Sequence, residues 1–80
     1  MTNHEIAVRF QRIADAMEVQ GENQFKIRAY RKAVDTIDEL GEPLADIEAR
    51  GGLSEISGFG EAIIGKTRDF LTRGSTKLYE

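Results

Sequence analysis

The chain has 80 residues, no cysteine, a single histidine and a formal net charge of −3. This length allows one small domain with one core, and the lack of cysteine excludes disulfides and thiolate metal sites. The lone His4 argues against a multi-histidine metal site or a Ser–His nucleophile pair. No apolar run approaches the roughly 20 residues of a membrane span, and the N-terminus has no signal-peptide pattern.

The first half of the chain predicts two amphipathic helices. Thr2 and Glu5 have the spacing of a capping box, and Gly21 is a suitable stop. Asn23 can cap a second helix, which Gly41 would end. Apolar residues recur at helical spacing in both segments. The residues expected to be buried are Ile6, Phe10, Ile13, Ala14 and Met17 in the first helix, and Ile27, Tyr30, Val34, Ile37 and Leu40 in the second.

The second half predicts shorter helical segments. Pro43 suits the first turn of a third helix that ends near Arg50. Residues 53–56 predict one further turn, and a last helix is expected over residues 61–73, with Gly74 as its stop and a frayed end after it. The buried residues expected here are Leu44, Ile47, Ile63, Thr67, Phe70 and Leu71. No strand pattern appears, so the predicted fold class is all-α, a compact bundle of four main helices.

Residues 56–60 read Ile-Ser-Gly-Phe-Gly, directly before the last helix. Gly58 and Gly60 allow a tight turn and a close approach of the backbone to a ligand, while Phe59 can be buried between them. The first amides of the following helix have no internal acceptor, and the helix dipole favours an anion there. The pattern therefore predicts main chain placed against a phosphate of a nucleic-acid backbone. The same pattern also occurs as an ordinary connector between packed helices.

Charge is unevenly distributed along the chain. Residues 25–34 carry four cations and no acid, whereas residues 35–62 carry a net charge of −7. Because screening acts over roughly 8–10 Å at physiological salt, a basic face could bind phosphate while an acidic face points away. The alternative is that each segment is simply a solvated helix face.

Two segments resemble a known family. Residues 56–66 resemble the helix–hairpin–helix motif of DNA repair proteins. Residues 25–37, Phe-Lys-Ile-Arg-Ala-Tyr-Arg-Lys-Ala-Val-Asp-Thr-Ile, resemble the second helix of the amino-terminal domain of family X DNA polymerases. The bacterial and archaeal members are the closer match, and the lyase domain of DNA polymerase beta is the eukaryotic relative. The resemblance implies a single helix–hairpin–helix DNA-binding domain over residues 1–80, in the cytoplasm of a bacterium or archaeon.

The resemblance implies a partner and a site. The partner is gapped, nicked or single-stranded DNA, bound without sequence preference during repair synthesis. The hairpin residues implied to contact a strand phosphate are Ser57, Gly58, Phe59 and Gly60, with the amides of Ala62 and Ile63. No cofactor is required, but Na⁺ or K⁺ held by the carbonyls of Ser57, Gly58 and Gly60 would bridge to the phosphate. The surrounding phosphate contacts would be Lys26, Arg28, Arg31, Lys32, Lys66 and Arg68.

Some family members are also 5′-deoxyribose phosphate lyases. Lys66 falls on the position of their Schiff-base lysine, and Lys26 and Tyr30 fall on positions that hold the 5′-phosphate and assist the chemistry. Two further lysines of the lyase pocket would fall at Ser54 and Ala62, so that part of the pattern is missing. The lysine must attack as a neutral amine, and neighbouring cations lower its pKa. The absence of these two lysines weakens that effect. Lys77 matches another pocket lysine only loosely.

Two alternatives therefore remain beside DNA binding. One is lyase activity through Lys66. The other is a protein-interaction module that has lost DNA binding, which the acidic run from Asp35 to Glu61 keeps open. No nucleotidyl-transfer carboxylate motif is present, so these residues cannot polymerise DNA, and further domains of a family X polymerase are expected partners.

Overall fold

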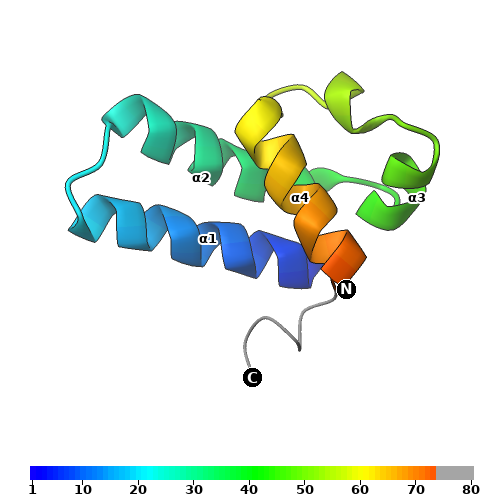
Figure 1. The fold of residues 1–80 in the computed structure, drawn as a ribbon, viewed down its shortest axis with the longest axis horizontal. Helices are drawn as coiled ribbons and strands as arrows, with labels where there is room; N and C mark the ends of the chain where they lie inside the picture. The colour runs from blue at the N-terminus through cyan, green and yellow to red at the C-terminus, as the bar shows by residue number, and fades with distance from the viewer. Residues whose placement is uncertain (74–80) are drawn as a thin grey trace.

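The computed structural model describes residues 1–73, and every element within that range is helical (Figure 1). The elements are α1 (Asn3–Val19), α2 (Gln24–Glu39), α3 (Leu44–Ala49), the 3₁₀ turn η1 (Leu53–Glu55) and α4 (Glu61–Arg73). The predicted all-α class is confirmed. The expected stop at Gly74 and the expected fraying of residues 75–80 lie outside the described residues.

Local hydrogen bonds explain where α1 and α2 begin. The amide of Glu5 donates to Thr2 Oγ1 at 3.1 Å and the amide of Thr2 donates to the Glu5 carboxylate at 2.8 Å, so the predicted capping box is confirmed. Asn23 Oδ1 accepts from the amide of Phe25 at 2.7 Å and starts α2. The two helices lie antiparallel, side by side (Figure 1).

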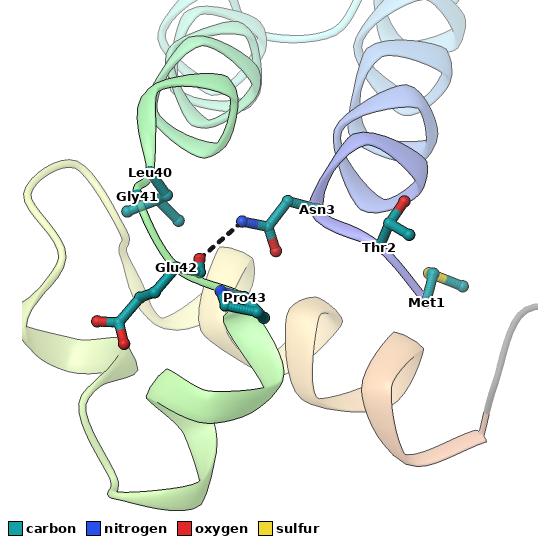
Figure 2. A pocket seen from close by; sticks show the side chains of 7 residues that line it. All are labelled: Met1, Thr2, Asn3, Leu40, Gly41, Glu42 and Pro43. Atoms are coloured by element: carbon teal, nitrogen blue, oxygen red, sulfur yellow. Dashed lines mark hydrogen bonds between the residues drawn. The ribbon is translucent and has the colours of Figure 1, made fainter.

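Asn3 fixes the entry into α3. Its side-chain amide donates to the carbonyl of Glu42 at 2.8 Å (Figure 2). Its side-chain oxygen accepts from the amide of Leu44, also at 2.8 Å. Pro43 occupies the N-cap position, one residue before the first turn where it was expected. An open hollow of about 470 Å³ lies here, between the start of α1 and the α2–α3 connection. It contains none of the predicted site residues.

The core forms where α4 crosses the α1–α2 pair. The ring of Phe10 meets Tyr30 and Phe70 edge to face, with centroid distances of 5.8 and 5.5 Å. The core residues predicted correctly are Ile6, Phe10, Ala14, Ile27, Tyr30, Ile37, Leu44, Ile47, Ile63, Thr67 and Phe70. Ile13, Met17, Val34, Leu40 and Leu71 were expected to be buried but are only partly covered.

Two alanines were missed as core residues. Ala7 is 2% exposed and Ala33 is fully buried, and both belong to the hydrophobic core. Periodicity of large apolar residues does not reveal such positions. Within residues 1–73 no helix is long and apolar enough to cross a membrane.

Candidate nucleic-acid interface

The hairpin between η1 and α4 is a tight turn closed by one hydrogen bond. The amide of Phe59 donates to the carbonyl of Ile56 at 3.1 Å. Gly58 takes a φ of +88°, the left-handed value that a type II turn requires at its third residue. Phe59 is only 8% exposed and anchors the turn to the core, whereas Gly58 and Gly60 are exposed. The expected arrangement of a buried ring between bare glycines is confirmed.

Most backbone donors of the hairpin and the first turn of α4 have no acceptor within residues 1–73. Phe59 donates to Ile56, and Ile64 donates to the carbonyl of Gly60 at 3.0 Å. Among residues 57–64, the amides that donate to no acceptor within residues 1–73 are those of Ser57, Gly58, Gly60, Glu61, Ala62 and Ile63. These donors lie at the positive end of the α4 dipole, so together they suit an anion.

The two glycines differ in what surrounds them. A Cβ atom added to Gly60 would meet no heavy atom within 4 Å. A Cβ atom added to Gly58 would meet the side chain of Lys32, with Cε at 3.4 Å, Cδ at 3.6 Å and Cγ at 3.8 Å. The hairpin backbone is therefore open to a ligand at Gly60, and Lys32 borders it at Gly58.

Two of the predicted phosphate-binding cations are paired with carboxylates. Arg31 contacts Asp15 at 3.2 Å and Glu18 at 3.1 Å, and the hydrogen bond to Glu18 is the main cause that raises the pKa of Arg31. Arg68 donates through Nε to Glu48 at 2.8 Å. Both arginines are on the surface, where such pairs are worth only about 0–1 kcal/mol. DNA would have to compete with these carboxylates for them.

The other predicted cations are in no ion pair with residues 1–73. Lys26, Arg28 and Lys32 are exposed on α2, and Lys66 is half-buried on α4. Of these four, Lys32 lies against the hairpin at Gly58. Sequence spacing alone could not separate Lys32 from its neighbour Arg31, because the partners of Arg31 come from α1.

Phe25 is a feature of this surface that the sequence analysis did not single out. It is 76% exposed, and the guanidinium carbon of Arg28 lies 5.9 Å from the centre of its ring. Phe25 precedes Lys32 by two helical turns, so both lie on one face of α2. Phe25 does not fall on the apolar stripe of α2 that contains Ile27 and Tyr30. This spacing could have predicted that its ring is exposed.

The residues matched to lyase positions are not equally accessible. Tyr30 is 3% exposed, and burial raises the pKa of its phenol. It therefore stays protonated at neutral pH and serves as a core aromatic against Phe10. Lys26 is exposed, and both Ser54 and Ala62 are exposed without adding a cation. Lys77 lies outside the described residues.

The backbone carbonyls of the hairpin are oxygen ligands of the kind that a monovalent cation prefers. Those of Ser57 and Gly58 accept no hydrogen bond from residues 1–73, whereas the carbonyl of Gly60 accepts one from Ile64. Carbonyl oxygens of this kind can replace the hydration shell of K⁺. In the same range no group of three or more His, Asp or Glu residues could hold a metal ion.

The fold and the glycine turn define a helix–hairpin–helix protein. A family model described as helix-hairpin-helix domain matches residues 1–76, so the chain belongs to that family. No curated protein matches the sequence. Helix–hairpin–helix domains generally bind DNA without reading its sequence, and DNA is accordingly the class of partner that the family indicates.

Proposed function

We propose that this chain is a DNA-binding module that recognises the phosphate backbone or strand ends of gapped or nicked DNA, as in repair synthesis. The observation that carries the proposal is the set of amides around Gly60, at the start of α4, that are unpaired within residues 1–73, together with open space where a Gly60 Cβ would stand. Such donors hold a phosphate oxygen without contacting a base. Binding is therefore independent of sequence.

The exposed aromatic on α2 supports a preference for DNA with unpaired nucleotides. Stacking of a base on an aromatic ring is worth about 1–3 kcal/mol and needs a free base face. Phe25 offers such a ring, with Arg28 beside it, on the same face as Lys32. An intact duplex keeps its bases stacked on one another, so it cannot use this contact.

One titration tests the proposal. Gapped, nicked, single-stranded and intact duplex oligonucleotides of one sequence are titrated at two salt concentrations by fluorescence anisotropy. We expect the gapped or nicked substrate to bind more tightly than the intact duplex, and affinity to fall with salt because phosphate binding releases counterions. Binding that is equal for all four, or independent of salt, would contradict the proposal. Scrambling the sequence should leave affinity unchanged.

The two alternatives have less support. The lyase needs Lys66 to act with neighbouring groups, and its matched assistant Tyr30 is buried. Borohydride trapping on abasic DNA decides the matter, since an adduct that disappears in Lys66→Ala would establish the enzyme.

The interaction module relies on the acidic segment of residues 35–62. It predicts that adding DNA does not shift the NMR signals of the Gly58 and Gly60 amides.

The proposal extends to the setting of the domain. We place it in the cytoplasm of a bacterium or archaeon, in association with further domains of a family X polymerase, because of the resemblance of residues 25–37 and 56–66. Na⁺ or K⁺ would bind the free carbonyls of Ser57 and Gly58 and one lone pair of Gly60. Affinity should then be higher in K⁺ than in a large organic cation at equal ionic strength.

A further inference from the structure

Lys32 lies along the hairpin glycine over much of its length. Three successive methylene carbons of its side chain are within 3.8 Å of the position that a Gly58 Cβ would occupy. The ammonium group is one bond beyond the nearest of them, Cε. A long side chain held by its methylene groups has fewer rotamers to lose on binding, while its charged end stays in water.

The adjacent cation on α2 is arranged in the opposite way. Arg31 turns toward α1 and contacts Asp15 and Glu18, whereas Lys32 makes no ion pair with any residue between 1 and 73. Two neighbouring positive charges thus have different surroundings. One is neutralised by the protein, and the other is free beside the unpaired amides of the hairpin.

We propose that Lys32 and the hairpin form one composite phosphate site, in which Gly58 positions the lysine stem and the Lys32 ammonium and the hairpin amides bind the same phosphodiester. The inference rests on the proposed function and assigns the charge of that site to one residue. Gly58 then has two roles, since it provides the left-handed turn and its Cα side lies in van der Waals reach of the stem. Arg31 is a structural residue that links α1 to α2.

The proposal is tested by two substitutions, each of which removes one positive charge from α2. Lys32→Met keeps an unbranched stem to pack on Gly58, and Arg31→Met is the matched control at the next residue. Affinity for a gapped oligonucleotide is measured at several salt concentrations. Because each neutralised phosphate of duplex DNA contributes about 0.9 to the log–log slope, we expect Lys32→Met to flatten the slope by about that amount. Arg31→Met should leave the slope unchanged, and Lys32→Arg should restore most of it.

The outcomes separate this inference from the proposed function. If the unmodified protein shows no salt-dependent binding of gapped DNA, the proposed function fails and the composite site with it. If that protein binds but Lys32→Met and Arg31→Met flatten the slope equally, or only Arg31→Met does, the composite site alone is wrong. Circular dichroism of each variant checks that the helices are retained.

A second readout does not depend on affinity. In an NMR titration with the same oligonucleotide, the Lys32 side-chain signals and the Gly58 and Gly60 amides should shift together, at one DNA concentration midpoint. In Lys32→Met the glycine amides should still shift, but at higher DNA concentration. Glycine shifts at an unchanged midpoint in Lys32→Met would overturn the shared site.

Discussion

Two glycine turns of this protein share a backbone conformation but differ in their hydrogen bonds. Gly21, between α1 and α2, and Gly58, in the hairpin, take φ values of +73° and +88°. In the α1–α2 turn, each amide of residues 20–23 donates within the chain. In residues 57–60, only Phe59 donates to an acceptor within residues 1–73. The first turn only connects two helices, whereas the second leaves its donors for a ligand.

The same contrast separates two helix starts. At α1, the side chains of Thr2 and Glu5 accept hydrogen bonds from two of the terminal amides, those of Glu5 and Thr2. At α4, the amides of residues 61–63 find no acceptor in the described part of the chain. Exposed amides are hydrated, so they cost little when no ligand is bound. The candidate site is therefore defined by the donors that residues 1–73 leave without an acceptor.

The largest expected effect concerns the ring under the hairpin. Phe59→Ala removes a buried side chain and should cost about 3–5 kcal/mol of unfolding free energy, a large part of the stability of a domain of this size. Phe25→Ala is the matched control, since its ring is 76% exposed and its loss should change stability by no more than about 0.5 kcal/mol. Urea denaturation followed by circular dichroism measures both. Equal costs would mean that Phe59 does not anchor the hairpin.

The two left-handed glycines give the most direct comparison of the turns. Gly21→Ala and Gly58→Ala each force an L-residue into positive φ and should each cost about 1–2 kcal/mol of stability. Only Gly58→Ala should also weaken DNA binding at a temperature where both variants are folded. If Gly21→Ala weakened binding as much, the α1–α2 turn would have to be counted as part of the interface.

Gly60 separates binding from stability. A Cβ there meets nothing within 4 Å, and its φ is not positive, so Gly60→Ala should leave the unfolding free energy nearly unchanged. The methyl group would nevertheless stand where the phosphate approaches, and we expect roughly tenfold weaker binding, about 1.4 kcal/mol. Gly41→Ala is the control, because Gly41 is equally open but lies in the α2–α3 connection. Anisotropy titrations of both variants give the comparison, and unchanged affinity in Gly60→Ala would contradict close approach.

The smallest effect is expected at the start of α1. Thr2→Ala removes the cap and should cost about 1 kcal/mol of stability without changing DNA affinity. The hydrogen bond from the Thr2 amide is the main cause that lowers the pKa of Glu5 in the folded protein. The stability that this hydrogen bond adds to the folded protein is therefore present at pH above the ordinary glutamate pKa of about 4.3. It is lost as the pH falls through the lowered pKa of Glu5. Glu5→Gln, which removes the titrating carboxylate, should reduce the acid sensitivity of the thermal midpoint, and an unchanged pH profile would contradict this.

Much of the fold followed from local patterns. The caps at Thr2 and Asn23 and the exposed glycines around Phe59 depend on residues close together in the chain. The ion pairs of Arg31 and the position of the Lys32 side chain beside Gly58 depend on how the helices pack. The spacing of residues along one helix cannot reveal this packing. The sequence therefore predicted a set of cations near the hairpin. It could not show which of them are paired with carboxylates and which lie beside the glycines.

We propose above all that the hairpin amides left unpaired within residues 1–73 hold a DNA phosphate. This proposal concerns the start of α4. Its most direct test is an amide-resolved NMR titration of the protein with a gapped oligonucleotide at low salt. The amides of Gly58, Gly60, Ala62 and Ile63 should shift strongly as phosphate accepts their hydrogen bonds, while those of Gly21 and Glu22 should stay in place. Shifts at the α1–α2 turn with none at the hairpin would contradict the account.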